Sequence, residues 1–230
     1  MSRVLAIVPA RGGSKGVPGK NVRKLAGRTL LDYTAFAARD SGVIDRIVLS
    51  TDSDEIADAG RRAGIEVPFM RPPALAQDDT PMLPVIQHTI DTLAADGWAM
   101  DVIVLLQPTS PLRRGSHVRD AVKLLHDSKA DSVVTVIEVP RHLSPDYVMR
   151  IDDGVLRPFL DEGARVTRRQ DARPAYAREG TVYAFWQTTL ERFGNIYGER
   201  CQPLMLDAAD SLSIDSPADW AEAERRLAER

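Results

Sequence analysis

Near its beginning the chain reads, over residues 7–21, Ile7-Val8-Pro9-Ala10-Arg11-Gly12-Gly13-Ser14-Lys15-Gly16-Val17-Pro18-Gly19-Lys20-Asn21. The apolar run Val4–Val8 is typical of a buried strand and leads into a loop with four glycines, two prolines and three cations. Glycine lets backbone N–H groups approach a ligand, so the loop with Arg11, Lys15 and Lys20 predicts a polyanion site. We expect a nucleotide triphosphate there. The alternative is a flexible basic surface loop, which would need neither the strand before it nor the helix pattern Leu30–Arg39 after it.

The spacing of this loop excludes two familiar phosphate-binding motifs. A Walker A loop reads G-x-x-x-x-G-K-[ST], whereas here Gly19-Lys20 is followed by Asn21 and Ser14 stands at the first glycine position. The dinucleotide fingerprint G-x-G-x-x-G fails because Gly12 and Gly13 are adjacent. P-loop kinases and NAD-dependent dehydrogenases are therefore disfavoured. A strand followed by a long cationic loop of this kind is typical of nucleotidyltransferases.

The composition is that of one globular domain. The chain has 230 residues, 25.3 kDa and 43% hydrophobic residues, enough for a full core, so we expect a single domain over 1–230. An isoelectric point of about 5.8 disfavours nucleic acid as a partner, although the first 31 residues carry seven basic side chains and no acidic one. The longest apolar run is too short to span a membrane, and no signal-peptide pattern follows Arg3. We therefore expect no membrane partner and a cytoplasmic location.

The cysteine and the histidines suggest no metal or nucleophile chemistry. Cys201 is the single cysteine, so it allows no internal disulfide, and we expect a packed, inert thiol. The four histidines show no ligand spacing, and His88 and His126 fall in helix patterns that predict structural roles. The sequence contains no recognisable Ser-His-Asp or Cys-His arrangement, so a covalent intermediate is disfavoured.

The pattern of the chain alternates between strand and helix. Apolar, β-rich runs occur at Val4–Val8, Arg46–Leu49, Val102–Leu106 and Ser132–Val139. Segments with helical periodicity occur at Leu30–Arg39, Asp54–Ala63, Met82–Ala94 and Val118–His126. Strands buried on both faces, with helices between them, predict a three-layer α/β/α fold around a mostly parallel, Rossmann-like sheet. Ligands of such sheets bind at the carboxyl ends of the strands, where the loops 9–21 and 107–113 both begin.

The alternation breaks at Pro140. Residues 140–178 contain the alternating pieces Tyr147–Ile151 and Val155–Phe159 around a turn, which predicts an inserted, hairpin-like subdomain. A core strand is expected to resume at Thr181–Trp186, and an amphipathic helix, Trp220–Leu227, closes the chain.

Several motifs occur in a fixed order along almost the whole chain. They are residues 7–21, Ser50-Thr51-Asp52, Arg71-Pro72, Leu105-Leu106-Gln107-Pro108-Thr109-Ser110-Pro111-Leu112-Arg113, Arg169-Gln170-Asp171 and Ser213-Ile214-Asp215. In sequence and order they resemble the acylneuraminate cytidylyltransferases, or CMP-sialic acid synthetases. The resemblance implies a fold of the nucleotide-diphospho-sugar transferase type, CTP and a sugar acid as substrates, and Mg²⁺ as cofactor. It also implies a homodimer in which the 140–178 excursion reaches across the neighbouring subunit's active site.

The resemblance assigns roles to residues by position. Those implied to bind the nucleotide are Ala10, Arg11, Gly12, Gly13, Ser14, Lys15, Lys20, Asn21, Arg71 and Asp78. Arg11 and Lys15 are implied as catalytic, because they would hold the phosphates and neutralise the leaving pyrophosphate. Those implied to bind the sugar acid are Gln107, Arg113, Arg169, Gln170 and Glu179, with Arg169 clamping the sugar carboxylate from its own or the partner subunit. Asp215 is implied as the metal ligand.

Some of these positions also have a structural interpretation. Asp52 precedes a helix pattern, so it is expected to cap that helix, with a place beside the nucleotide as the alternative. In the family the arginine that matches Arg71 contacts the cytosine base, and the resemblance implies the same role here; alternatively Arg71 pairs with Asp78 or Asp79. The prolines around Gln107 alternatively make only a rigid turn.

Two positions depart from the family pattern. The usual D-I-D is Ser213-Ile214-Asp215 here, so this chain offers one carboxylate where the pattern offers two. Either metal affinity is weaker, or a ligand role passes to water, Asp210 or the nucleotide; Asp215 alternatively caps the last helix. Glu179-Gly180-Thr181 stands where many relatives have Asn-Gly-Ala, and a carboxylate beside the sugar pocket would change which sugar fits.

The sequence therefore predicts a Mg²⁺-dependent cytidylyltransferase. It would transfer CMP from CTP to the anomeric hydroxyl of an acylneuraminate-type sugar acid (sialic, legionaminic or pseudaminic) and release pyrophosphate. The sequence identifies no general base. The alternatives are a Kdo-type cytidylyltransferase and a CTP-binding homologue that has lost catalysis.

Overall fold

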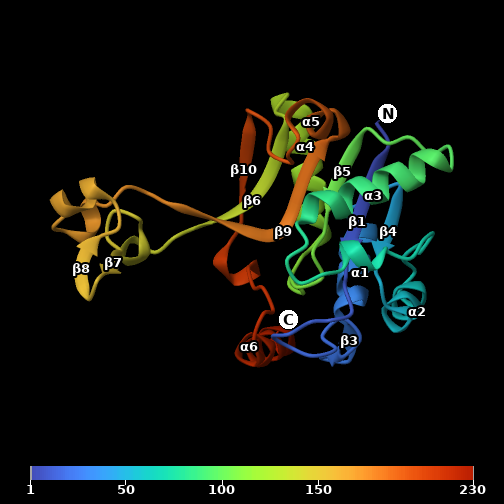
Figure 1. The fold of residues 1–230 in the computed structure, drawn as a ribbon, viewed down its shortest axis with the longest axis horizontal. Helices are drawn as coiled ribbons and strands as arrows, with labels where there is room; N and C mark the ends of the chain where they lie inside the picture. The colour runs from blue at the N-terminus through green and yellow to red at the C-terminus, as the bar shows by residue number, and fades with distance from the viewer. Residues whose placement is uncertain (1, 230) are drawn as a thin grey trace.

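Six strands form the central sheet of the computed structural model, which describes residues 2–229 except for the side chains of residues 164 and 165. In spatial order they are β10 (Cys201–Met205), β6 (Ser132–Glu138), β9 (Tyr176–Trp186), β5 (Val102–Leu105), β1 (Val4–Pro9) and β4 (Arg46–Ser50). The β1–β4, β1–β5 and β6–β10 pairs are parallel, whereas β9 runs antiparallel to both of its neighbours. The predicted, mostly parallel sheet is confirmed (Figure 1).

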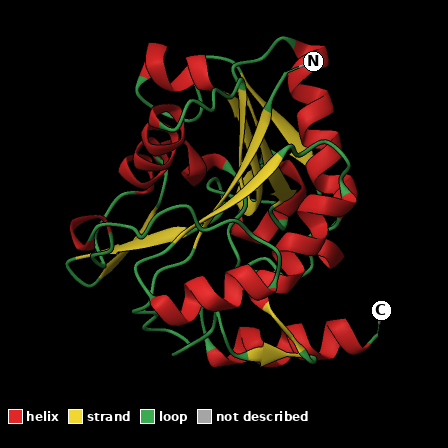
Figure 2. Ribbon diagram, turned by 90° about the vertical axis from the view of Figure 1, so that its right-hand side faces the viewer, coloured by secondary structure: helices red, strands yellow, loops and turns green. Residues whose placement is uncertain are grey.

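Helices cover both faces of the sheet, which makes three layers (Figure 2). One face packs against α1 (Leu30–Asp40), α2 (Asp54–Arg62) and α4 (Gly115–Ser128), and the other against α3 (Met82–Ala95) and α5 (Gln187–Phe193). Along β1, Val4, Ala6 and Val8 join the first core, and Leu5 and Ile7 join the second. This division follows from the alternation of side chains along a strand. The predicted three-layer α/β/α fold is confirmed.

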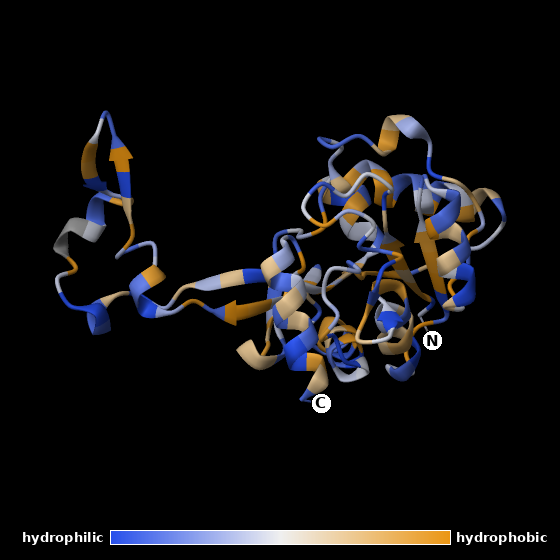
Figure 3. Ribbon diagram, turned by 90° about the horizontal axis from the view of Figure 1, so that it is seen from below, coloured by the Kyte–Doolittle hydropathy of each residue, from blue (hydrophilic) through white to orange (hydrophobic). Residues whose placement is uncertain are grey.

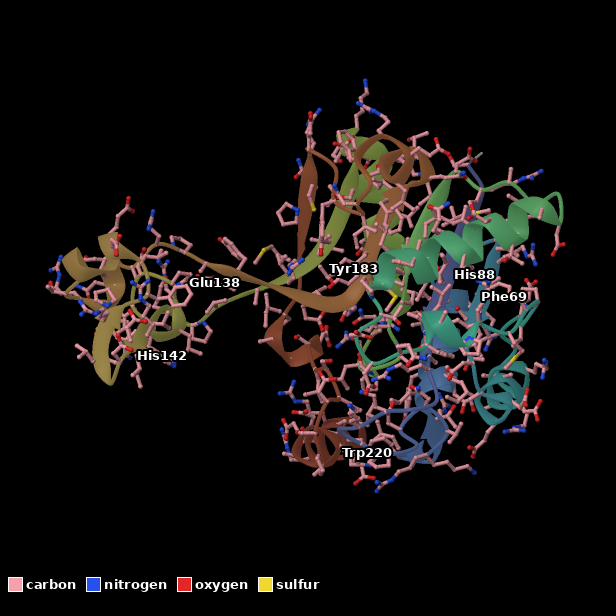
Figure 4. The ribbon with its side chains drawn as sticks, in the orientation of Figure 1. Phe69, His88, Glu138, His142, Tyr183 and Trp220 are labelled. Atoms are coloured by element: carbon pink, nitrogen blue, oxygen red, sulfur yellow. The ribbon has the colours of Figure 1, made fainter. Side chains whose placement is uncertain are left out.

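A third apolar cluster lies below the sheet. It joins Val17 of the glycine-rich loop to Ile214 and to Trp220 of the last helix, α6 (Pro217–Ala228). A short hairpin, β2 (Lys24–Leu25) and β3 (Arg28–Thr29), contributes Leu25 to the same cluster. Figure 1 shows α6 beside this hairpin, and Figure 4 marks Trp220 there. The cluster thus holds the C-terminal segment against the loop 9–21.

The chain leaves the sheet after β6 and returns at β9. Residues 140–175, here called the arm, carry the two-stranded hairpin β7 (Met149–Asp152) and β8 (Val155–Pro158) and project far from the sheet (Figures 1 and 3). The strand β9 begins at Tyr176, so the last residues of the predicted excursion pair with β6. Short 3-10 helices lie at Pro73–Leu75, Arg141–Leu143, Asp161–Arg165, Arg169–Asp171 and Ala208–Asp210.

The expectation of a packed Cys201 is wrong, because this cysteine is exposed. The reason is the strand β10, which sequence patterning did not identify and which forms an edge of the sheet. Its residues alternate between exposed and half-buried, and Cys201 lies in the exposed set. His88 and His126 both lie in helices, as expected. His88 meets the Phe69 ring edge-on at 4.9 Å (Figure 4). His126 meets the Trp186 ring edge-on at 4.8 Å. No helix within residues 2–229 is long and apolar enough to cross a membrane.

Candidate active site

A cavity of about 390 Å³ opens at the carboxyl ends of β1 and β5, where a parallel sheet is expected to bind its ligand. Its wall combines the loop after β1, the Gln107–Thr109 segment after β5, Arg71, Met82, and Ser213 with Asp215 from the C-terminal segment. Nine of the predicted site residues line it: Ala10, Arg11, Ser14, Lys15, Lys20, Asn21, Arg71, Gln107 and Asp215. Seven others, all within the described part of the chain, lie outside its wall: Gly12, Gly13, Asp78, Arg113, Arg169, Gln170 and Glu179.

The backbone of the loop 9–21 is fixed from the neighbouring strand. The Ala10 N–H donates to the carbonyl of Ser50 at 3.0 Å, and the Gly12 N–H donates to the Asp52 carboxylate at 2.9 Å. The helix α2 is capped by Ser53, whose hydroxyl accepts from the Ile56 N–H. The expectation that Asp52 caps α2 is therefore wrong, because its carboxylate holds the loop instead.

Two cations of the loop share one carboxylate. Arg11 and Lys15 both form an ion pair with Asp78, and their hydrogen bonds hold the pKa of Asp78 below its ordinary value. The Lys15 side chain is 79% exposed and the Arg11 side chain 31%. These charges therefore lie at the mouth of the cavity, where an incoming polyanion meets them first.

The third cation, Lys20, is held in a different way. Its side chain is only 13% exposed, and its ammonium group donates to the carbonyl of Ile214 at 2.6 Å. The same group lies 3.4 Å from the Asp215 carboxylate. Lys20 thus ties the loop to the C-terminal segment as well as contributing charge to the cavity.

Arg71 reaches the cavity from below. It is buried, and its guanidinium donates to the Ser50 hydroxyl at 3.0 Å and to the Ser50 carbonyl at 2.5 Å. Burial lowers its pKa, and the nearby Asp52 charge opposes that shift. The alternative pairing of Arg71 with Asp78 is wrong, because Asp78 pairs with Arg11 and Lys15.

Gln107 follows the end of β5 and forms another part of the cavity wall. Its neighbour Thr109 accepts a hydrogen bond from the Ile214 N–H at 2.9 Å. Arg113, predicted to bind the sugar, is buried beneath this segment and donates to the Gln107 carbonyl. The structure thus places this side chain behind the cavity wall, where it supports Gln107, and not in the wall itself.

Glu179 is also buried behind this wall. One of its carboxylate oxygens accepts from the Thr181 N–H at 2.8 Å, inside β9. The next residue, Gly180, lies so close to Gln107 that a Cβ there would be 2.8 Å from its Oε1 atom. Glu179 is therefore adjacent to the Gln107 wall but screened from the cavity by protein.

The C-terminal segment supplies the remaining carboxylate. Asp215 has a side chain that is 73% exposed at the cavity, and one of its oxygens accepts from the Ser213 hydroxyl at 2.9 Å. The helix α6 is capped by Ser216, so the alternative that Asp215 caps it is wrong. The described residues contain no group of three or more His, Cys, Asp or Glu side chains that could hold a metal ion.

Asp210, the alternative metal ligand, has other partners. Its carboxylate pairs with Arg114 at 2.6 Å and lies 3.5 Å from the ring of His117. Burial lowers the pKa of His117, and the Asp210 charge opposes that shift. These contacts join the segment before Asp215 to the beginning of α4.

Arg169 and Gln170 lie in the arm and are exposed. They are far from the cavity of their own chain, because the arm projects away from the sheet (Figure 1). The sequence reasoning also missed some wall residues, among them Met82, Thr109 and Gly16. The start of a helix at Pro81 and the family motif around Gln107 were the available signals for the first two.

Comparisons with known proteins show the family of the chain. Residues 5–225 match the model of a protein family described as Cytidylyltransferase. The chain is 36% identical to a CMP-N,N'-diacetyllegionaminic acid synthase of Legionella pneumophila, over 98% of this chain and 96% of that protein. It is 29% identical to a pseudaminic acid cytidylyltransferase of Campylobacter jejuni, over 78% of this chain and 76% of that protein.

The fold has a close counterpart among solved structures. A CMP:2-keto-3-deoxy-manno-octonic acid synthetase in complex with CTP superposes with a TM-score of 0.73, over 99% of each chain. At 15% identity this likeness shows the fold alone.

Proposed function

The chain belongs to the cytidylyltransferase family, and we propose that it transfers CMP from CTP to the anomeric hydroxyl of an acylneuraminate-type sugar acid. One observation carries this proposal: cations of the glycine-rich loop and Gln107 line a single cavity. The cations suit a triphosphate, and an amide fixed on a proline-stiffened segment suits a ligand rich in hydroxyl groups. The names of the relatives support legionaminic, pseudaminic or N-acylneuraminic acid as the acceptor.

In the proposed reaction the anomeric oxygen forms a bond to the α-phosphorus. The bond from that phosphorus to the pyrophosphate oxygen breaks on the opposite side, and the hydroxyl proton passes to water. Arg11 and Lys15 bind the phosphates and stabilise the negative charge that develops on the departing pyrophosphate. We assign Arg71, which lines the cavity and is oriented by its bonds to Ser50, to contact with the base.

Mg²⁺ is the cofactor that we propose. The residues present fit an ion that arrives with the triphosphate, since Mg²⁺ takes one or two carboxylates together with phosphate oxygens and water. Asp215 would hold it from the cavity wall, with the Ser213 hydroxyl fixing the carboxylate. When bound, the ion would offset phosphate charge. Asp215→Asn should raise the Mg²⁺ concentration needed for half-maximal turnover, whereas Asp207→Asn, outside the cavity wall, should not.

We further propose a homodimer formed through the arm. Seven of the eleven large hydrophobic residues that are exposed in residues 2–229 lie on the arm, including Ile151 at 74% and Leu156 at 62%. The hairpin of the arm carries hydrophobic residues in Figure 3. Exposed apolar side chains gathered in one place favour a protein interface. A second copy covering this hairpin would carry Arg169 to a cavity that its own chain does not let it reach.

The dimer is tested by sedimentation. The double change Ile151→Asp with Leu156→Asp should give monomers, whereas Phe36→Asp, an exposed apolar residue of α1, should leave the assembly unchanged. Mixing inactive Arg169→Met and Arg11→Met chains should restore part of the activity if Arg169 acts in the partner subunit. Activity that stays absent in the mixture would exclude that arrangement.

The function itself is tested by pyrophosphate release from CTP with Mg²⁺. The acceptor panel is N-acetylneuraminic, legionaminic, pseudaminic and Kdo sugar acids, and release with one of the first three supports the proposal. Release with Kdo alone would favour the alternative that only the fold likeness supports. CTP binding without release for any acceptor would favour a homologue that has lost catalysis.

Because the reaction uses CTP, we propose that the protein acts in the cytoplasm.

A further inference from the structure

Buried polar atoms without partners gather behind the Gln107 wall. Within the described residues, four buried side-chain atoms find no hydrogen-bond partner, and three of them are Ser110 Oγ, Glu179 Oε1 and Thr181 Oγ1. Their residues are 2%, 6% and 0% exposed. Folded proteins satisfy most buried polar atoms, so a group of exceptions marks a place where another requirement fixes the chain.

Arg113 links three parts of the structure at this place. Its buried guanidinium donates to the Thr181 carbonyl of β9 at 2.6 Å and to the Gln107 carbonyl at 2.5 Å. A third bond, at 3.3 Å, reaches the hydroxyl of Thr34 in α1. A planar guanidinium can serve three directions at once, which the ammonium group of a lysine does not do with the same geometry.

The strand β9 is irregular where Arg113 contacts it. The pairing register with β6 shifts between Val134 and Val136, and the Thr135 hydroxyl there donates to the Glu179 carbonyl at 2.8 Å. The same hydroxyl accepts from the Val182 N–H at 2.9 Å. Such irregularities redirect side chains and occur next to active sites. Here the irregular segment brings Gly180 against the Gln107 amide, at a distance that leaves no room for a Cβ.

Glu179 supplies the negative charge of this buried region. Burial lowers the pKa of Arg113 to about 10, and the Glu179 charge acts in the opposite direction. Glu179 Oε2 accepts from the Thr181 N–H, while the carbonyl of Thr181 accepts from Arg113. The two charged side chains therefore hold the same residue of β9, Glu179 through its N–H and Arg113 through its carbonyl.

The geometry points to Arg113 and Glu179 as two buried charged side chains, linked through the backbone of Thr181, that position Gln107 for the acceptor. Neither side chain touches a ligand; both are positioning residues that act through the Gln107 backbone and the Gly180 contact. The pair thereby determines how tightly the acceptor binds, and it leaves the phosphate side of the cavity unaffected. This inference rests on the proposed function, because that function assigns Gln107 to the acceptor.

The first test separates the two substrates. Arg113→Lys keeps the charge but loses the planar donor set, and Glu179→Gln keeps the shape but loses the charge. Each should raise the acceptor KM at least about tenfold and change the calorimetric CTP Kd less than about twofold. Arg119→Lys and Glu191→Gln are matched exposed controls and should change neither value. An unchanged acceptor KM, or equal changes for both substrates, would overturn the inference.

The second test does not depend on activity. A double-mutant cycle with Arg113→Met and Glu179→Met, read by denaturant unfolding, should show coupling of roughly tenfold in the unfolding equilibrium constant. Additive effects of the two changes would exclude this coupling. If the unmodified chain binds CTP but transfers CMP to no sugar acid, the proposed function fails, while this cycle still decides whether the two side chains are coupled. Arg113→Lys with Glu179→Gln gives the same cycle should the methionine variants not fold.

Discussion

On one side of the cavity Lys15 is 79% exposed and pairs with Asp78, whereas on the other side Arg113 is buried and donates to three protein oxygens. Exposed charges keep their hydration and can exchange one anionic partner for another at little cost. A buried charge is fixed by its surroundings and exchanges nothing. The phosphate side of the cavity, with Lys15, is therefore suited to attract a charged ligand. The acceptor side, with Arg113 behind it, is suited to keep the Gln107 wall in a fixed position.

Lys20 combines both properties. It belongs to the glycine-rich loop and lines the cavity, yet its side chain is nearly buried and donates to the Ile214 carbonyl. Removing an exposed cation such as Lys15 should therefore change function alone. Removing Lys20 should change function and stability together.

The largest effect is expected for Arg11→Met. Loss of this charge should lower kcat/KM for CTP by about 10²–10³-fold, the usual cost of removing one donor that stabilises developing charge. Lys15→Met should also lower it. Because both side chains are partly or largely exposed, the melting temperatures should stay near that of the unmodified chain. Pyrophosphate release and thermal unfolding measure the two effects, with Arg119→Met as the exposed control. A large fall in the melting temperature of either variant would show that the exposed cations stabilise the fold, and the phosphate side would then not differ from the acceptor side in this respect.

Gly16→Ala should act on stability instead. A Cβ at Gly16 would collide with the carbonyl oxygen of Asp215, so the loop and the C-terminal segment would have to separate. We expect a loss of roughly 1–3 kcal/mol in the free energy of unfolding, typical of overpacking. Gly13→Ala is the matched control, because its Cβ meets only Arg11 Nη1, at 3.8 Å. Equal stability of the two variants in urea would show that the loop does not rest on Asp215.

Much of this arrangement was predictable from the sequence. Apolar runs placed the strands, and the cations of the loop 9–21 and Gln107 follow two strands whose carboxyl ends meet at one edge of the sheet. These predictions depend on local pattern, and the local pattern is clear.

The contacts behind the wall were not predictable in the same way. An arginine after a proline-rich motif gives no local sign that Arg113 is buried, since charged residues are usually exposed. The bond of Lys20 to Ile214 joins residues 194 positions apart, and the bond of Asp52 to Gly12 joins residues 40 apart. Only tertiary packing brings such pairs together. The exposure of Cys201 depends on the edge position of β10, which its own sequence does not reveal.

Lys20→Met should have an intermediate effect. It removes the donor to the Ile214 carbonyl, and the free energy of unfolding should fall by about 1 kcal/mol, the net value of one hydrogen bond. The apparent affinity for CTP should fall as well, because a positive charge leaves the cavity. Lys15→Met is the comparison variant, with a similar loss of charge and no loss of stability. If Lys20→Met unfolds at the same urea concentration as the unmodified chain, Lys20 belongs with the exposed cations.

The smallest effect is expected for Asp78→Asn, which tests whether the phosphate side really exchanges partners. Without the carboxylate, Arg11 and Lys15 no longer leave an ion pair to meet the triphosphate, so the CTP Kd should fall, by less than about fivefold. The two cations lower the pKa of Asp78, so its carboxylate stays charged at pH 5–8 and the ratio of the two Kd values should be constant there. Because the pKa of Asp78 is lower in the folded protein than in the unfolded chain, the Asp78 carboxylate stabilises the fold above its unfolded pKa of about 3.9. This contribution disappears as the pH falls through the lowered pKa of the folded protein. Calorimetric titrations of both chains at several pH values measure this ratio. A weaker Kd for Asp78→Asn would mean that Asp78 holds the cations in place for the phosphates, and that both sides of the cavity depend on fixed charges.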